Sequence, residues 1–489
     1  MTTPMLGING QLYIGGEWQE AASGERRKVI APATAKRIAD IAWATTADAD
    51  RAVAQAKEAS RNGSWADRPG RERSRILLKV SQLIRERAEE LAQAESADVG
   101  KPIFFTRMID VPTAAEQFEY FAALAQTLDG SVRNTPLEAF AFTRREPVGV
   151  VAALTPFNFP LILSSSKLAP ALAAGNTIVH KPAEDTPLSA ILLAQIFEDA
   201  GLPKGVYNLI TGAGAELGEY LVQHPDVSLV ALTGSTAVGK KVSAMAGELL
   251  KPVVTELGGN AAHIVFADAD VNVAVGAIIN AFVFNTGQFC MAGPRLLVER
   301  PLLDTLVGIL SGAVGNVPIG RPSDPNTVIG PLVSEKQLRR VEAFVEKARA
   351  QGGRVVAGGE RHDLDGGYYY KPTIIVGLPN EAEAVQEEVF GPVLTVQPFD
   401  TEEEAIALAN STRYGLAAGI QTTNIARAHR VAAKLDAGIV WVNGWSLLDP
   451  AVPFGGVKSS GAGRESGPEA LLGYTRTKSV VIATPAPRA

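Results

Sequence analysis

Five short apolar blocks lie between residues 148 and 256, and all but the last are followed by a turn and a stretch with helical periodicity. Continuous apolar strands that alternate with helices are typical of a parallel sheet with crossover helices on its faces. Ligands of such sheets bind beyond the carboxyl ends of the strands. The predicted strands are 148–154, 177–180, 206–210, 229–232 and 253–256.

The region before these blocks shows other patterns. Residues 8–43 predict short strands and turns, whereas residues 71–95 place apolar side chains on one helical face, opposite arginine and glutamate. The segment 100–102 ends that run, and residues 112–128 again have a helical pattern. Residues 129–147 are more polar and alternate only weakly, which favours a protruding hairpin over a core strand.

A second series of helices and strands begins near residue 260 and continues to about residue 460. A further strand candidate, 479–483, has no obvious partner nearby in the sequence. It is expected to pair either with the 129–147 hairpin or with another subunit. The second series comprises helices near 271–284, 301–312, 334–350, 402–410 and 424–436, and strands near 295–299, 416–421 and 439–442.

The composition is that of a globular protein with more than one domain. A chain of 489 residues is too long for one ordinary core, so two or three domains are expected. Hydrophobic residues make up 46% and charged residues 20%, which is a globular balance. The net charge of −6 is scattered along the chain, which disfavours nucleic acid or an anionic membrane surface as a partner.

Several absences in the sequence bear on the compartment. No apolar run approaches the ~20 residues of a membrane span, and residues 1–6 lack the basic start and apolar core of a signal peptide. A single cysteine suits a reducing compartment, so we expect a soluble cytoplasmic protein. The five histidines are dispersed and none pairs with the cysteine at a metal-ligand spacing, so no metal site is expected.

That single cysteine, Cys290, has two interpretations. A lone cysteine cannot form an intrachain disulfide and is most often a small buried hydrophobe. However, Gly287 precedes it and Gly293-Pro294 follows it, between a helical stretch and a strand. Such a bend lets the backbone approach a ligand, which allows a reactive role. Taken alone, this pattern favours packing slightly over catalysis.

Polar residues follow the first two predicted strands of the parallel series. Asn158 lies in the turn 155–160, where it either caps the next helix or directs an amide donor into a site. Lys181 and Glu184 follow the second strand, three residues apart. They are either a solvated ion pair or two groups at the mouth of the ligand crevice.

Glycine-rich turns carry further candidates. Gly234 to Gly239 joins a strand to a helix, where backbone N–H groups can approach a phosphate, although the spacing is not the usual dinucleotide fingerprint. Glu256 precedes two glycines at a strand end, where a carboxylate either caps a turn or acts as a base. Glu388 is followed by an aromatic residue and Gly-Pro, and the glycines of 453–464 form either an ordered loop or simple turns.

Together these segments resemble the NAD(P)-dependent aldehyde dehydrogenase superfamily over nearly the whole chain. Each segment alone is weak, but all occur in the order and at the separations typical of the family. The matching segments are Thr155–Pro160, His180–Glu184, Gly234–Gly239, Glu256–Gly259, Gly287–Cys290, Glu388–Pro392 and Pro453–Arg464.

The resemblance implies an α/β fold with three parts. A Rossmann-like parallel-sheet cofactor domain would comprise residues 1–128 and 148–258, and a second α/β catalytic domain residues 259–460. A small β element for bridging and oligomerisation would comprise residues 129–147 and 461–489. Family members are usually homodimers or homotetramers, so a homo-oligomer is expected.

The resemblance also implies roles for individual residues. Cys290 matches the nucleophile, Asn158 the oxyanion-hole amide and Glu256 the general base. Lys181 and Glu184 match the groups that hold the adenosine ribose. The other implied cofactor contacts are Thr155, Phe157, Gly234, Ser235, Gly258, Glu388 and Phe390. The implied substrate-tunnel residues are Phe159, Leu163, Ser166, Phe289, Met291, Trp445, Leu448 and Phe454.

These roles predict oxidation of an aldehyde to a carboxylic acid. Thiolate attack by Cys290 gives a thiohemiacetal that loses hydride to the nicotinamide, and Glu256 activates the water that hydrolyses the resulting thioester. Glu184 would repel a 2′-phosphate and Lys181 would attract it, so we expect NAD with some use of NADP possible. An apolar tunnel favours an aromatic or medium-chain aliphatic aldehyde over a dicarboxylic semialdehyde.

Three alternatives stay open at the level of sequence. In a CoA-acylating relative, CoA rather than water would take the acyl group, and a water-activating Glu256 would be counterproductive. A reductase acting on acyl substrates would usually prefer NADPH, which Glu184 disfavours. A non-catalytic cofactor-binding relative would have no need of the complete set Cys290, Glu256, Asn158 and Glu388.

Overall fold

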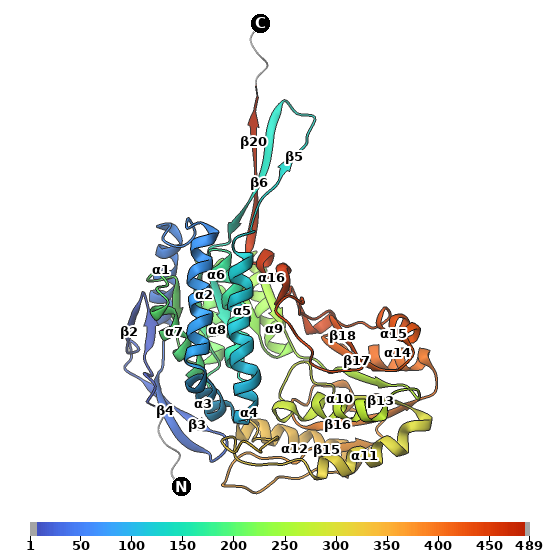
Figure 1. The fold of residues 1–489 in the computed structure, drawn as a ribbon. Helices are drawn as coiled ribbons and strands as arrows, with labels where there is room; N and C mark the ends of the chain where they lie inside the picture. The colour runs from blue at the N-terminus through green and yellow to red at the C-terminus, as the bar shows by residue number, and fades with distance from the viewer. Residues whose placement is uncertain (1–6, 485–489) are drawn as a thin grey trace.

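The computed structural model describes residues 7–484 and has two sheet-centred lobes and a projecting arm (Figure 1). Residues 1–6, which carried the expectation about a signal peptide, and residues 485–489 lie outside the described range. No helix among residues 7–484 is long and apolar enough to cross a membrane.

The first lobe is built on an eight-stranded sheet in the order β19-β11-β10-β7-β8-β9-β1-β2. Its five central strands are parallel and correspond to the five apolar blocks of the sequence, while β1, β2 and β19 add antiparallel edges. The strands are β1 Leu12–Ile14, β2 Glu17–Gln19, β7 Val150–Leu154, β8 Thr177–Lys181, β9 Tyr207–Leu209, β10 Leu229–Thr233, β11 Val253–Glu256 and β19 Gly461–Ala462.

Helices cover both faces of this sheet, and every residue of β7, β8 and β10 is buried as a result. One face packs against α1 Thr46–Arg61, α8 Gly214–Gln223 and α9 Thr236–Glu248. The other packs against α2 Gly70–Glu86, α3 Ala88–Val99, α5 Val111–Leu124, α6 Pro160–Ala173 and α7 Leu188–Asp199.

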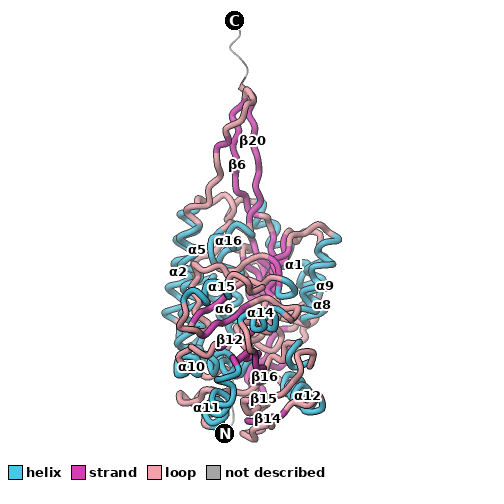
Figure 2. The backbone as a smooth tube through the Cα atoms, turned by 90° about the vertical axis from the view of Figure 1, so that its right-hand side faces the viewer, coloured by secondary structure: helices cyan, strands magenta, loops and turns pink. Residues whose placement is uncertain are grey.

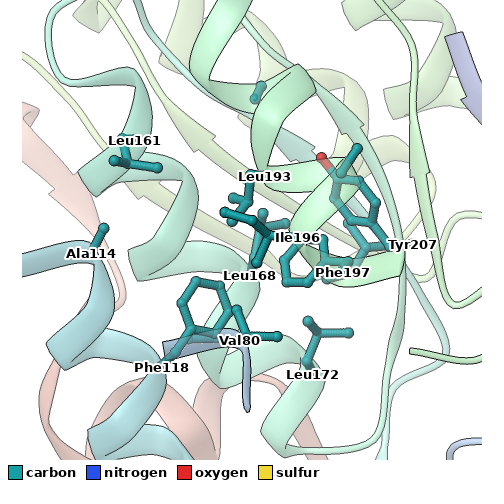
Figure 3. Close-up of a cluster of buried hydrophobic side chains, with 14 of the residues drawn as sticks. Val80, Ala114, Phe118, Leu161, Leu168, Leu172, Leu193, Ile196, Phe197 and Tyr207 are labelled. Atoms are coloured by element: carbon teal, nitrogen blue, oxygen red, sulfur yellow. The ribbon is translucent and has the colours of Figure 1, made fainter. Parts of the chain in front are cut away.

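The larger core of the lobe lies on this second face (Figure 3). Phe118 of α5 contacts Phe197 of α7 edge-on, with ring centroids 5.7 Å apart, and Phe197 contacts Tyr207 of β9 at 4.6 Å. Leu168 and Leu172 of α6 are fully buried beside them. This packing fixes α6, the helix that begins directly after the predicted Asn158 turn.

The second lobe contains a seven-stranded sheet in the order β14-β15-β16-β13-β12-β17-β18, parallel except for the β14–β15 pair. Its strands are β12 Ala262–Val265, β13 Arg295–Glu299, β14 Arg354–Ala357, β15 Thr373–Val376, β16 Val393–Phe399, β17 Ala417–Gln421 and β18 Ile439–Val442. Its helices are α10 Val271–Val283, α11 Leu303–Gly315, α12 Glu335–Ala350, α13 Glu383–Gln386, α14 Glu402–Asn410 and α15 Ile425–Ala432.

The arm is a three-stranded antiparallel sheet that extends away from both lobes (Figures 1 and 2). It consists of β5 Val132–Arg133, β6 Ala139–Pro147 and β20 Thr475–Ala483. The C-terminal strand candidate therefore pairs with the 129–147 hairpin of its own chain, from Thr475 opposite Pro147 to Ala483 opposite Ala139. Helix α16 Gly467–Gly473 leads into it.

A few elements differ from the sequence pattern. The amphipathic run 71–95 is two helices, α2 and α3, because the backbone of Arg87 leaves helical geometry at φ −99° and ψ 23°. Residues 26–42, within the region of predicted short strands, form the hairpin β3 Arg26–Ala31 and β4 Lys36–Ala42. The remaining short elements are α4 Ile103–Phe105, a π-helix Thr106–Asp110 and 3₁₀ turns Phe284–Gly287, Arg300–Leu302 and Lys458–Ser460.

The register of the first sheet aligns the carboxyl ends of its central strands. Leu154 pairs with Lys181, and Thr233 pairs with Glu256, so these four residues end neighbouring parallel strands at one edge. The loop that carries Cys290 reaches this edge from the second lobe, because Cys290 lines a pocket together with residues of the 156–158 turn and the 233–235 turn.

Candidate active site

Strained and closely packed backbone holds Cys290 in place. Asn285 and Thr286 have left-handed conformations, with φ of 48° and 56°, which non-glycine residues adopt only when their surroundings impose it. A Cβ on Gly287 would lie 2.2 Å from the carbonyl oxygen of Gly391. A Cβ on Gly259 would lie 2.2 Å from the carbonyl oxygen of Cys290. These two positions therefore require glycine.

Asn158 is tied directly to the Cys290 loop. Its Nδ2 donates to the carbonyl oxygen of Gln288 at 3.0 Å, and the Nδ2 of Asn285 donates to the carbonyl oxygen of Asn158 at 3.0 Å. Asn158 is buried yet lines the same pocket as Cys290. Since an amide carries two N–H groups, the bond to Gln288 orients the side chain and leaves the second N–H for a ligand.

The pocket between the lobes encloses about 160 Å³. The structure thus brings together eight of the residues predicted from the sequence, from five separate segments. Four further lining residues, Pro156, Thr233, Gln337 and Arg340, were not predicted. The eight predicted residues are Phe157, Asn158, Gly234, Ser235, Gly258, Cys290, Glu388 and Phe390.

Glu256 ends β11 with a buried carboxyl group. Within residues 7–484, neither of its carboxyl oxygens accepts a hydrogen bond from a side chain, and the backbone N–H of Gly456 is the one donor that acts on the group. Burial raises its pKa well above the ordinary value, and the negative charge of Glu465 raises it further. A buried carboxyl group with a raised pKa can accept a proton from a ligand once it has lost its own.

A buried salt bridge lies near Glu256. Lys167 of α6 forms a salt bridge with Glu465, and its Nζ also donates to Thr233 Oγ1 at 2.6 Å. Ser166 Oγ donates to Glu465 Oε2 at 2.8 Å. The sequence analysis identified Ser166 only as a tunnel residue and did not single out Lys167 or Glu465.

The Glu388–Phe390 turn is positioned by helix α12. Gln337 Nε2 donates to the carbonyl oxygen of Phe390 at 2.7 Å, and Arg340 donates to that of Glu388 at 2.8 Å. Phe390 has a φ of 59°, so these contacts hold a strained residue. The carboxylate of Glu388 accepts from the backbone N–H of Gly259 at 3.3 Å, and burial raises its pKa to about 7.

Lys181 and Glu184 lie apart from this pocket. Lys181 is buried, its Nζ donates to the carbonyl oxygen of Pro182, and burial lowers its pKa to about 8. Glu184 is exposed and accepts from the backbone N–H of Gly214, the first residue of α8, at 3.2 Å. Thr155 Oγ1 is bonded to His180 Nε2 at 3.0 Å and so faces the sheet interior.

Five of the eight predicted tunnel residues share one apolar cluster. It joins the two lobes and also contains residues that the sequence analysis did not single out, among them Phe105, Ile109, Phe284 and Trp441. Leu448 is half-exposed, and the backbone of Phe454 pairs with that of Glu465. The five predicted members are Phe159, Leu163, Phe289, Met291 and Trp445.

The surroundings of Cys290 disfavour the thiolate in the resting protein. Burial raises its pKa above the ordinary value, and the carboxylates of Glu388, Glu256 and Glu465 raise it further. We therefore expect alkylation of the cofactor-free protein by iodoacetamide to accelerate about tenfold per pH unit between pH 7 and 9, because only the thiolate reacts. The readout is unambiguous because Cys290 is the only cysteine.

Glutathione provides the control for this pH dependence, since the alkylation rate of an ordinary free thiol levels off near the pKa of that thiol. An alkylation rate of Cys290 that stayed constant from pH 6 to 9 would show instead that the thiolate already forms in the resting protein.

Comparison with known proteins identifies the family of this chain. The model of the aldehyde dehydrogenase family matches residues 18–480. A putative aldehyde dehydrogenase from Burkholderia cenocepacia is 42% identical with a TM-score of 0.96, over 97% of this chain and 98% of that one. The chain therefore belongs to the aldehyde dehydrogenase family.

Two further solved structures are similar over nearly their whole length. Betaine aldehyde dehydrogenase from Staphylococcus aureus in complex with NAD+ is 37% identical with a TM-score of 0.97, over 99% of this chain and 96% of that one. The indole-3-acetaldehyde dehydrogenase AldA of P. syringae, in complex with NAD+ and IAA, is 42% identical with a TM-score of 0.96, over 98% and 97%.

Proposed function

We propose that this protein oxidises an aldehyde to the carboxylic acid with NAD, by way of a thioester on Cys290. The observation that carries this proposal is one pocket that contains the Cys290 thiol and an oriented Asn158 amide, with the buried carboxyl group of Glu256 close enough for its charge to act on the thiol. These are the nucleophile, the oxyanion donor and the base that acyl chemistry needs.

The pocket residues fit a dinucleotide. Ser235 caps α9, so the helix N-terminus faces the space that a phosphate would fill. A Cβ on Gly258 would lie 2.3 Å from Glu388 Oε2, so only glycine leaves room for that carboxylate, which would hold the nicotinamide ribose. Glu184 and Lys181 would hold the adenosine ribose, and the exposed carboxylate of Glu184 favours NAD over NADP. When bound, the nicotinamide supplies the hydride acceptor.

The first half of the reaction depends on Cys290 and Asn158. The Cys290 thiol first gives its proton to water, the thiolate sulfur then attacks the aldehyde carbon, and the carbonyl electrons move to the oxygen. The free N–H of Asn158 and the backbone N–H of Cys290 stabilise that oxyanion, and losing one such donor typically costs about 2.7–4 kcal/mol of transition-state stabilisation. Collapse of the thiohemiacetal with loss of hydride leaves a thioester on Cys290.

The second half depends on Glu256. Its carboxylate takes a proton from water as the water oxygen bonds to the thioester carbon, the C–S bond breaks, and its electron pair returns to sulfur. The raised pKa of Glu256 makes it a stronger base than an exposed glutamate, but it must first lose its proton. Hydrolysis is therefore expected to accelerate as the pH rises towards that pKa.

The apolar cluster favours an aromatic or medium-chain aliphatic substrate. Phe284 contacts Phe159 and Phe289 with ring centroids 5.8 and 5.6 Å apart, and Trp441 and Trp445 add a second aromatic pair. The buried cation nearest to Phe159, Lys101, is neutralised by Asp110 at 2.5 Å. Within the part of the chain that the structure describes, Lys101 therefore offers no free positive charge to a second carboxylate.

An aldehyde panel tests this assignment. We expect NADH formation with benzaldehyde and hexanal to exceed that with succinic semialdehyde by at least about tenfold in kcat/KM, because an unpaired carboxylate in an apolar site is costly. NADP in place of NAD is expected to lower the rate. Faster oxidation of succinic semialdehyde would contradict the proposed tunnel.

We also propose that the chain forms a homo-oligomer through its arm. Strand β20 has an open edge, and the arm exposes apolar side chains that a monomer would leave in water. These side chains are Val132, Leu137, Phe140, Val481 and Ile482.

The parts of the chain then correspond to a cofactor domain (1–128 and 148–258), a catalytic domain (259–460) and a bridging element (129–147 and 461–489). Residues 461–462, however, pair within the cofactor-domain sheet. The reduced thiol that the reaction needs favours the cytoplasm as the compartment of this protein.

A further inference from the structure

The carboxylate of Glu465 is held in the interior by three side chains. Ser166 Oγ donates to Oε2 at 2.8 Å, whereas Lys167 and Thr233 both contact Oε1, Thr233 at 3.5 Å. Glu465 is only 3% exposed and Ser166 4%. Ser166 is therefore the contact that fixes the second oxygen and, with it, the plane of the carboxylate.

This carboxylate lies beside the proposed base. Thr233 is the direct register partner of Glu256 across the β10–β11 ladder. Among the charged groups that act on Glu256, Glu465 has the largest effect, ahead of Lys167 and Arg464. The backbone of Glu465 pairs with Phe454, whose neighbour Gly455 packs against Glu256 Oε1. The orientation of Glu465 thus bears on the environment of Glu256.

Ser166 also has an alternative acceptor, the carbonyl oxygen of Leu163 at 3.2 Å. A hydroxyl has one hydrogen, and the bond to the carboxylate is both shorter and charge-assisted, so it is the stronger of the two. The hydroxyl is therefore committed to Glu465 rather than to the apolar tunnel.

We propose that Ser166 is a positioning residue for hydrolysis of the acyl-enzyme, acting by holding the Glu465 carboxylate in one orientation beside Glu256. This role rests on the proposed function. Ser166 and Lys167 together hold both carboxylate oxygens of Glu465, which fixes this side chain beside Glu256. Without the hydroxyl donor, the carboxylate is held through one oxygen only and can rotate, so the buried surroundings in which Glu256 activates water are no longer fixed.

The test separates hydride transfer from hydrolysis in the full-length enzyme. Rapid mixing of wild type and Ser166→Ala with NAD and hexanal gives the rate of the first NADH turnover. Intact-mass analysis of quenched samples gives the lifetime of the acyl group on Cys290. We expect first-turnover rates within about twofold and acyl-enzyme lifetimes roughly tenfold longer in Ser166→Ala, the effect of losing a charge-assisted hydrogen bond.

A matched control lies at the neighbouring position of the same helix. Ser165 is fully buried, and its hydroxyl donates to the carbonyl oxygen of Leu161 at 2.8 Å, away from Glu465. Ser165→Ala also removes one buried hydroxyl from α6, so it reports any general loss of helix packing. It is expected to leave the acyl-enzyme lifetime unchanged.

A double variant shows whether Ser166 acts through Glu465. In a Glu465→Gln background, Ser166→Ala is expected to lengthen the acyl-enzyme lifetime no further, since the carboxylate is gone. An equal loss in both backgrounds would overturn the proposal. So would a Ser166→Ala enzyme with a normal lifetime and altered KM for wide aldehydes, which would make Ser166 a tunnel residue. A wild type that forms no NADH would contradict the proposed function itself.

Discussion

Replacing Cys290 with alanine is expected to reduce aldehyde-dependent NADH formation by a factor on the order of 10⁴ or more, the scale seen when a nucleophile that acts in a catalytic unit is removed. The reason is chemical: without the sulfur, neither the thiohemiacetal nor the thioester can form. Steady-state NADH absorbance across the aldehyde panel measures the loss.

The Cys290→Ala protein should otherwise be intact. The side chain is small and partly exposed at the pocket, so its loss creates little cavity. The affinity for NAD, measured by quenching of tryptophan fluorescence, and the midpoint of thermal unfolding should both stay close to the wild-type values. Residual oxidation at more than a few per cent of the wild-type rate would show that another group carries the chemistry.

Replacing Glu256 with glutamine is expected to trap the acyl-enzyme. Glutamine has nearly the same shape but cannot accept the proton of water, so hydrolysis should slow about 10²–10⁴-fold while attack by Cys290 continues. Stopped-flow absorbance should show a burst of close to one NADH per active site and then almost no turnover. Mass analysis of the quenched protein should find the acyl group on Cys290.

Glu256→Asp distinguishes a missing base from a damaged pocket. Aspartate keeps the carboxylate on a side chain one methylene shorter, so it should retain partial hydrolysis and a shorter acyl-enzyme lifetime than glutamine. A Glu256→Gln enzyme without any NADH burst would indicate that Glu256 is also needed earlier, to take the proton of the Cys290 thiol, whose pKa is raised.

The first sheet was predictable because its strands are buried on both faces. β7 is an unbroken apolar run, β8 and β10 each contain a continuous apolar stretch, and helices of ordinary length separate the three strands. The regular alternation of strands and helices is interrupted in the second lobe. Between β15 and β16 there is only the four-residue α13, and β14 pairs antiparallel, so no alternation of strand and long helix marks them.

Some residues of the candidate site could be predicted from the sequence and others could not. Cys290, Asn158 and Glu256 follow strand ends or bends and carry a local sequence pattern. Gln337 and Arg340 donate to backbone carbonyls about 50 positions away. Every residue has a backbone carbonyl, so no sequence pattern identifies these acceptors. The bond from Ser166 to Glu465 joins residues 299 positions apart, so only the folded chain reveals it.

The most direct test of the central claim is to quantify NADH and carboxylic acid formed by wild type from its best aldehyde, with and without CoA. Hydrolysis of a Cys290 thioester by water that Glu256 activates predicts one acid per NADH, with no dependence on CoA. An acyl-CoA product formed only when CoA is present, or acid formed without NADH, would contradict the account.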